Sequence, residues 1–256
     1  MHLQQVVDPN MPTIFVVTPT YTRLTQRADI TRFVNTIKHV EKMHWIVIED
    51  SEHPTEAVRE LMAESGIPGT QLYTKTPENS EKKDGMERFQ YHRGVDQRNL
   101  ALNKIAAMGD KNAIVYFADD DNTYSLEVFD EMRKTERVSV WPVAFVGGQK
   151  YERPIVVDGK VKKWHVSWHP ERTYPTDMAS FAFHSSLLHT GRVPQFSHEW
   201  RQGFLESGFL EQLLDSPEDL EPRGDNCTKI LVWHTRTMDV NIKREAKLRA
   251  EPFIKV

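Results

Sequence analysis

Short apolar runs alternate with amphipathic stretches through the first half of the chain. The β-branched run TIFVVTP over 13–19 predicts a strand stopped by proline, and MHWIVIEDS over 43–51 predicts a second strand that ends in acid. Between these runs, apolar residues recur at helical spacing over 24–40. A short helix over 54–65 and a third strand over 70–74 are predicted to follow.

The same alternation continues toward the middle of the chain. The polar segment 75–94 predicts a long mobile loop, residues 95–107 predict a helix, and NAIVYFADDD over 112–121 predicts another strand. Strands that alternate with helices in this way form largely parallel sheets that helices cover on both faces. We therefore expect an α/β fold.

The second half is less regular. Residues 139–148 predict a strand, residues 203–214 a helix, and residues 227–237 a closing strand, with no internal repeat. Within the closing strand, His234 and Arg236 alternate, so an extended backbone would point both side chains to one side. A histidine and an arginine side by side are suited to binding a diphosphate.

Composition excludes several classes of protein. The chain has 256 residues, 39% of them apolar, and a net charge of −4, which argues against a general nucleic-acid surface. No apolar run approaches the ~20 residues that span a bilayer, so we expect a membrane anchor only in a longer native chain. The single cysteine, Cys227, excludes an internal disulfide and a cysteine-built zinc site. Asn226 begins an Asn-Cys-Thr glycosylation sequon.

The most unusual stretch is the aspartate triplet Asp119–Asp121, which ends an apolar strand. Adjacent carboxylates repel one another, so a lysine, an arginine or a metal ion should lie beside them. Capping of the next helix would explain one aspartate but not three. An EF-hand calcium loop is excluded, because Tyr124 stands where the loop needs glycine and no glutamate occupies the twelfth position.

Polar residues also end two other predicted strands, at Thr18–Tyr21 and at Glu49–Ser51. In open α/β sheets, ligands bind beyond the carboxyl ends of the strands, so the three strand ends should meet at one crevice. A hard divalent cation held by one or two carboxylates and by substrate phosphates would neutralise the triplet there. Nucleotide-sugar transferases and other phosphate-transferring enzymes fit this pattern.

Eight stretches in chain order closely resemble the β-1,3-glucuronyltransferase family over roughly residues 12 to 237: PTIFVVTPTYTR, HWIVIEDSE, RGVDQRNLAL, YFADDDNTY, VGGQKYERP, TDMASFAF, LESGFL and DNCTKILVWHTRT. The resemblance implies a GT-A-type fold, with a mostly parallel central sheet, helices on both faces and a smaller acceptor-binding part. It implies transfer of glucuronate from UDP-glucuronate to the 3-hydroxyl of a terminal galactose on a glycan, with inversion, Mn²⁺, a homodimer and a Golgi location. The donor part would comprise residues 12–121 and the acceptor and catalytic part residues 122–256, within one compact domain.

The resemblance also implies roles for single residues on the donor side. Tyr21 would stack on uracil and Asp50 would accept its N3–H, while Asp121 would bind the metal. Asp120 would face the ribose and Asp119 the arginines. The remaining donor-binding residues would be Thr20, Arg93, Arg98, His234 and Arg236.

On the acceptor side, the resemblance assigns Glu206, in the first turn of its helix, as the general base. The helix dipole would help to keep this carboxylate ionised. The acceptor sugars would contact Glu152, Trp168, Arg172 and Asp177.

Two rival functions remain open from the sequence. A metal-dependent nucleotidyltransferase would use the same carboxylates and metal, and would release pyrophosphate from a nucleoside triphosphate. A non-catalytic module would bind UDP or a glycan without turnover. The acceptor also stays open, between the galactose of a proteoglycan linker and terminal N-acetyllactosamine.

Overall fold

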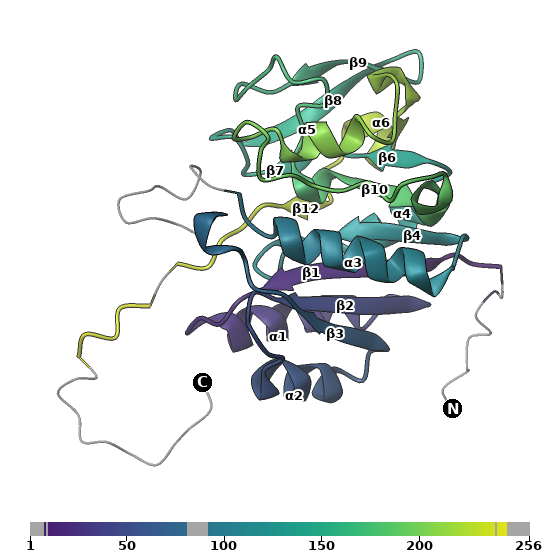
Figure 1. Ribbon diagram of the computed structural model, residues 1–256. Helices are drawn as coiled ribbons and strands as arrows, with labels where there is room; N and C mark the ends of the chain where they lie inside the picture. Colours follow the sequence, from purple (N-terminus) through teal and green to yellow (C-terminus); the bar gives the residue numbers. More distant parts are fainter. Residues whose placement is uncertain (1–7, 9, 81–91, 239, 245–256) are drawn as a thin grey trace, which may run out of the picture.

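The structure is a computed structural model that describes residues 8, 10–80, 92–238 and 240–244. Its first half builds four adjacent parallel strands in the spatial order β4-β1-β2-β3 (Figure 1). The strands are β1 (Thr13–Thr20), β2 (Met43–Glu49), β3 (Gly69–Tyr73) and β4 (Ala113–Phe117). The helices that connect them are α1 (Gln26–Ile37), α2 (Glu56–Ser65) and α3 (Val95–Met108).

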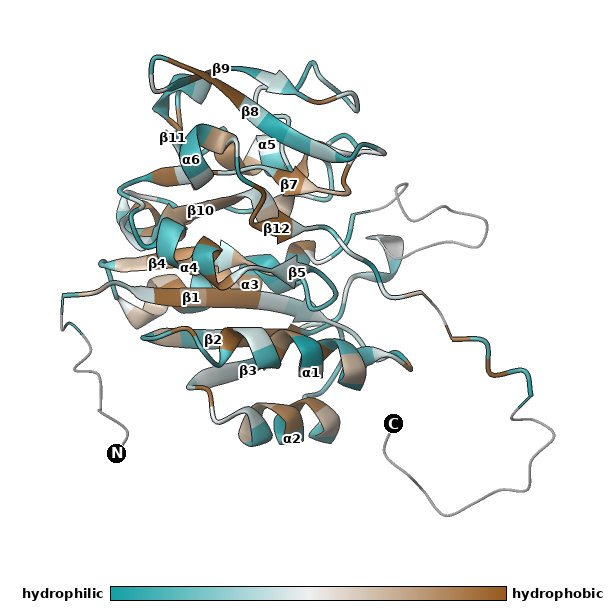
Figure 2. Ribbon diagram, turned by 180° about the vertical axis from the view of Figure 1, so that it is seen from behind, coloured by the Kyte–Doolittle hydropathy of each residue, from teal (hydrophilic) through white to brown (hydrophobic). Residues whose placement is uncertain are grey.

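Helices cover both faces of this sheet, which is why its strands are apolar at nearly every position. Along β1, Phe15 and Val17 point to one face and pack in the same cluster as the buried side chains of α3. The alternate residues Ile14 and Val16 point to the other face, where α1, α2 and α4 (Leu126–Met132) pack. Figure 2 shows part of β1 brown and its carboxyl end paler, seen from the side of α1 and α4. The predicted α/β class is confirmed.

The second half extends the same sheet and adds a smaller one. Strand β10 (Phe181–His184) lies antiparallel beside β4, and β6 (Val138–Val140) and β11 (Glu221–Pro222) complete the seven strands. The smaller sheet has the order β5-β12-β7-β8-β9. Its strands are β5 (Thr123–Tyr124), β7 (Val143–Ala144), β8 (Tyr151–Val157), β9 (Lys160–His165) and β12 (Val232–Trp233). The other helices are α5 (Leu205–Leu210), α6 (Gly224–Cys227) and short 3₁₀ turns at Glu78–Ser80, Met178–Ser180, Ser185–His189 and Pro217–Asp219.

Several predictions for the second half were wrong in detail. The strand predicted over 139–148 is two short strands in different sheets, because the backbone leaves the large sheet at Trp141 and Pro142 cannot donate a ladder hydrogen bond. The strand predicted over 227–237 is only β12, and the helix predicted over 203–214 is only α5. Strand β10, the β8–β9 hairpin and helix α4 were not predicted.

Other expectations have mixed outcomes. Of the loop predicted over 75–94, residues 81–91 lie outside the described residues. The division at residue 121 stays a prediction, and the seven-stranded sheet takes strands from both sides of it. Asn226 of the sequon is exposed, whereas Cys227 is buried. In the described part of the chain, no helix is both long enough and apolar enough to cross a membrane.

Candidate active site

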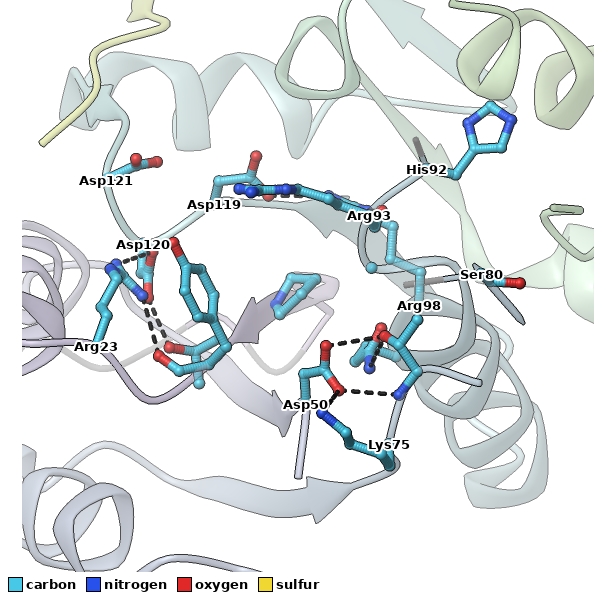
Figure 3. A pocket seen from close by; sticks show the side chains of 16 residues that line it. Arg23, Asp50, Lys75, Ser80, His92, Arg93, Arg98, Asp119, Asp120 and Asp121 are labelled. Atoms are coloured by element: carbon cyan, nitrogen blue, oxygen red, sulfur yellow. Dashed lines mark hydrogen bonds and ion pairs between the residues drawn. The ribbon is translucent and has the colours of Figure 1, made fainter. Parts of the chain in front are cut away.

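A cavity of about 330 Å³ opens where β1, β2 and β4 end (Figure 3). The three polar strand ends therefore meet at one crevice, as the sequence predicts. Of the residues expected to bind the donor or its metal, eight line the cavity: Thr20, Tyr21, Asp50, Arg93, Arg98, Asp119, Asp120 and Asp121. His234 and Arg236 are not among its lining residues.

Two of the three aspartates are paired with arginines. Asp119 accepts a hydrogen bond from Nη2 of Arg98 at 2.9 Å, which confirms that it faces an arginine. Asp120 pairs at 2.7 Å with Arg23, a residue that the sequence reasoning missed. The signal was present, because Arg23 follows Tyr21 by two residues in the loop after the first strand.

Asp120 is buried, and both of its oxygens are engaged by the protein. One accepts from Arg23, and the other accepts from the Thr20 hydroxyl at 2.7 Å. Burial raises the pKa of Asp120 to about 6, against the opposing effect of Arg23. The expected ribose contact stays a prediction.

The start of α3 brings its two arginines to the cavity. Arg93 precedes the helix and Arg98 lies one turn inside, and Nη1 of Arg98 donates to the Arg93 carbonyl at 2.9 Å. Gly94 between them has φ +67°, and a Cβ atom there would lie 2.5 Å from Nη1 of Arg98. Only glycine therefore allows this turn and this approach together.

Asp50 and Tyr21 line the same cavity. The two oxygens of Asp50 accept from the backbone N–H and the hydroxyl of Thr76, at 2.9 and 2.8 Å. The Tyr21 ring is 43% exposed, with the guanidinium carbons of Arg23 and Arg93 at 4.8 and 5.8 Å from its centroid. An exposed ring can stack on a base, and a carboxylate in the same cavity can accept a hydrogen bond from the edge of that base.

The structure decides against the capping alternative for these aspartates. Helix α2 is capped by Thr55, whose hydroxyl accepts from the backbone N–H of Val58, and α4 is capped by Ser125 in the same way. Asp50 and the triplet therefore do not serve as the caps of α2 and α4.

Asp121 also lines the cavity, beside the chain that follows β12. Its backbone carbonyl accepts from the Thr235 hydroxyl at 2.7 Å, so the segment 234–237 lies against the triplet. Among the described residues, no group of three or more His, Cys, Asp or Glu side chains could hold a metal ion. A cation bound by one carboxylate, by substrate phosphates and by water needs no such group, and an oxygen ligand suits Mg²⁺ or Mn²⁺.

His234 reaches toward the second half of the site. Its Nδ1 lies 3.0 Å from Oδ2 of Asp177, and its Nε2 lies 3.4 Å from Nε of Arg236. The charge of Asp177 raises the pKa of His234 to about 9, although burial opposes this. Burial tends to raise the pKa of Asp177 in turn, but its pair with His234 holds it below the usual range.

Two glutamates near this pair, Glu206 and Glu152, have raised pKa values. Burial, then the charge of Asp177, raises the pKa of Glu206 to about 7, even though Glu206 lies in the first turn of α5 as predicted. The expectation that the helix dipole keeps Glu206 ionised is therefore wrong, because burial and the charge of Asp177 outweigh the groups that favour the carboxylate. Burial likewise raises the pKa of Glu152 to about 7, and Arg172 only partly opposes this. Oε1 of Glu152 is buried and has no hydrogen-bond partner in the described part of the chain.

The remaining predicted acceptor residues, Trp168 and Arg172, pack against each other. The Trp168 ring is 41% exposed and packs against Gly203, where a Cβ atom would lie 2.5 Å from the ring. Arg172 is buried, donates to the carbonyls of Trp168 and Gly203, and has its Cζ atom 5.5 Å from the Trp168 ring centroid. An exposed indole face of this kind can carry the apolar face of a sugar.

This arrangement, a nucleotide-sized cavity with an acid triplet beside a cluster of glutamates, is that of a nucleotide-sugar-dependent glycosyltransferase. The sequence model of glycosyltransferase family 43 matches residues 33–238, and the chain belongs to that family. Homo sapiens galactosylgalactosylxylosylprotein 3-beta-glucuronosyltransferase 3 is 46% identical over 253 residues, which cover 94% of this chain and 75% of the relative. Canis lupus familiaris 3-beta-glucuronosyltransferase 2, of the same galactosylgalactosylxylosylprotein type, is 42% identical over 98% of this chain and 75% of its own length.

Solved structures agree on the fold. S. aureus TarS 1-349 in complex with UDP-GlcNAc superposes with a TM-score of 0.52 at 13% identity, and covers 90% of this chain and 60% of that chain. The mannosyltransferase PcManGT from Pyrobaculum calidifontis, in complex with GDP-Man and Mn²⁺, gives 0.51 at 15% identity, over 88% and 57% of the two chains. Likenesses at this identity establish the GT-A-type α/β fold alone.

Proposed function

We propose that this chain transfers glucuronate from UDP-glucuronate to the 3-hydroxyl of a terminal galactose, with inversion and with Mn²⁺ bound. The observation that carries the proposal is the junction at Arg98. This arginine pairs with Asp119 in the donor cavity, and its charge also acts on Asp177 and Glu206. The donor cavity and an acid cluster suited to proton transfer are therefore neighbours, with Arg98 near both.

Binding of the donor falls to residues around the cavity. Tyr21 stacks on uracil, and Asp50 accepts its N3–H, which discriminates uracil from cytosine. Thr20, Arg93, Arg98 and the first two aspartates of the triplet hold the ribose and glucuronate part. His234, cationic through its pair with Asp177, and Arg236 grip the diphosphate, whose negative charge would offset the repulsion between these two cations.

Asp121 is the residue that would hold the divalent cation. When bound, the cation supplies positive charge for the departing diphosphate. A separate protein acid for the leaving group is then unnecessary.

Glu206 receives the proton of the attacking galactose hydroxyl. Inversion by direct displacement puts the nucleophile on the face of the sugar opposite the leaving UDP, so the base belongs to the acceptor side. A pKa of about 7 suits this role, because a base works best when its pKa lies near the operating pH. Glu152, Arg172 and Asp177 orient the acceptor, and Trp168 supplies the platform for its galactose.

A panel of UDP-sugars and galactosides, assayed with Mn²⁺ and with excess chelator, tests the proposal. We expect turnover with UDP-glucuronate and galactose-terminated acceptors only when the metal is present. Pyrophosphate release from UTP would instead identify a nucleotidyltransferase. UDP binding without any turnover would identify a binding module. The same panel separates galactosyl-galactose from N-acetyllactosamine acceptors.

The assembly and location follow the family resemblance. We propose a homodimer, and a Golgi enzyme whose longer native chain carries the membrane anchor. Sedimentation of the purified chain tests the first, and imaging of the full-length protein tests the second.

A further inference from the structure

Asp29, in the first turn of α1, is a fully buried carboxylate to which the scheme above gives no role. Its two oxygens accept hydrogen bonds from four side chains. One oxygen accepts from Nη2 of Arg23 at 2.8 Å and from the Thr25 hydroxyl at 3.0 Å. The other accepts from Nη2 of Arg32 and from the Thr237 hydroxyl, both at 2.5 Å. Burial of an ionised carboxylate is costly unless it is paired in this way.

The first arm of this network reaches the base and ribose end of the donor cavity. Arg23 bridges Asp29 and Asp120 with the same Nη2 atom. Its guanidinium also lies over the Tyr21 ring, 4.8 Å from the centroid, and Nη1 donates to the Tyr21 carbonyl at 3.4 Å. The position of Arg23 therefore fixes both Tyr21 and Asp120.

The second arm reaches the segment 234–237, which carries the residues proposed to grip the diphosphate. His234 is held by Asp177, the Thr235 hydroxyl donates to the Asp121 carbonyl, and Thr237 is held by Asp29. Arg236 lies between the last two of these anchors. The anchor at Asp29 connects sequence positions 208 residues apart.

We propose that Asp29 is a positioning residue that fixes the two walls of the donor site relative to each other. Through Arg23 it holds the wall that binds uridine, and through Thr237 it holds the wall that binds the diphosphate. This inference rests on the proposed donor function and goes beyond it, because Asp29 itself lies outside the cavity. A neutral side chain cannot replace it fully. Each oxygen of Asp29 accepts from one guanidinium and one hydroxyl, whereas a carboxamide has only one accepting oxygen and no charge.

The test compares UDP and UMP binding by calorimetry in Mn²⁺ for wild type, Thr237→Val and Asp29→Asn. Thr237→Val cuts only the second arm, so UDP affinity should fall about tenfold while UMP affinity changes less than about twofold. Asp29→Asn loosens both arms, so both affinities should fall. Adding Thr237→Val to Asp29→Asn should then cost little more, because the two substitutions act through one group.

Thr31→Val is the matched control. Thr31 lies on the same helix, and its exposed hydroxyl donates to the Arg27 carbonyl of that helix. Its UDP affinity and thermal midpoint should equal those of wild type. If Asp29→Asn does not fold, the ratio of UDP to UMP affinity in Thr237→Val decides the question.

Two results would overturn the inference. One is wild-type UDP affinity in Thr237→Val, and the other is an equal loss of UDP and UMP affinity in that variant. Either leaves the proposed function intact if wild type binds UDP and turns over. Failure of wild type to bind UDP at all would remove the proposed function itself.

Discussion

The donor cavity and the acid cluster beside it handle negative charge in opposite ways. In the cavity, Asp119 and Asp120 are each paired with an arginine, and Asp120 also accepts from a hydroxyl. In the cluster, Glu152 and Glu206 have pKa values near 7, and one oxygen of Glu152 has no partner in the described part of the chain. Fully paired carboxylates hold a geometry, whereas incompletely paired ones remain able to accept protons or hydroxyl groups. This difference supports the proposal that the first region binds the donor and that the second takes part in proton transfer.

Removal of the metal ligand should have the largest effect. Asp121→Ala should lower kcat by about 10⁴-fold or more, because charge on the departing diphosphate is left without a cation. Metal-dependent UDP binding should weaken, while the circular dichroism spectrum stays that of wild type. Full activity of wild type in excess chelator would contradict the assignment.

Glu206→Gln should remove the proton acceptor of the acid cluster and leave UDP binding in the donor cavity unchanged. The variant keeps size and most hydrogen bonding but cannot take the proton, so kcat should fall ~10²–10⁴-fold. The Kd of UDP, measured by calorimetry, should stay near that of wild type. If turnover is nearly normal, Glu152 and Asp177 are the next residues to test as the base.

The pH dependence of kcat should follow the ionisation of Glu206. Glu206 must be ionised to act as a base, so the rate should fall about tenfold per pH unit below its pKa of about 7. At the other end, His234 loses its charge above a pKa of about 9, so UDP binding should weaken there. Single-turnover rates from pH 5 to 8 measure the low-pH limb, and the Kd of UDP from pH 8 to 10 measures the loss at high pH. A low-pH limb of unchanged position in Glu206→Gln would refute this origin.

Discrimination between uracil and cytosine tests the donor cavity. Asp50 can accept the N3–H of uracil, whereas N3 of cytosine offers no N–H and would face the carboxylate as a second acceptor, so CDP should bind about tenfold more weakly than UDP. Asp50→Ala should narrow that gap, whereas Thr31→Val should preserve it. Calorimetry with both nucleotides measures it, and equal wild-type affinities would rule out the role of Asp50.

Glu152→Gln should have the smallest effect of these substitutions. It should show how much stability the protein loses when Glu152 ionises. The folded-state pKa of Glu152 is raised from 4.5 to about 7, so its stabilising contribution is complete below 4.5 and is lost as the pH rises through 7. Glutamine does not titrate, so the melting temperature of the variant relative to wild type should rise by a few degrees between pH 5 and pH 8. The acceptor KM should increase at the same time. A difference in melting temperature that is the same at both pH values would disprove the assigned pKa.

Much of the first half of the fold could be predicted because its signals are local. Each apolar run of β1, β2 and β4 is continuous in sequence, and the polar residues that end these strands must share one edge of a parallel sheet. Strand β10 could not be predicted, because its four residues become a strand only by pairing with β4 and β6. The small sheet is similar, since β12 consists of two residues held by partners more than 80 positions away.

By itself, the sequence determined the α/β class, the crevice at the strand ends and the need for positive charge beside the aspartate triplet. Its motifs also carried the family resemblance and, with it, the choice of Glu206. The tertiary structure alone decided which cations form ion pairs with the triplet: Arg98 pairs with Asp119 and Arg23 pairs with Asp120. It also decided that the glutamates near His234 have pKa values near 7, and that Asp29 joins α1 to Thr237. The physical reason is that hydrogen bonding along a strand or helix is local, whereas burial and ion pairing depend on residues that only the folded chain brings together.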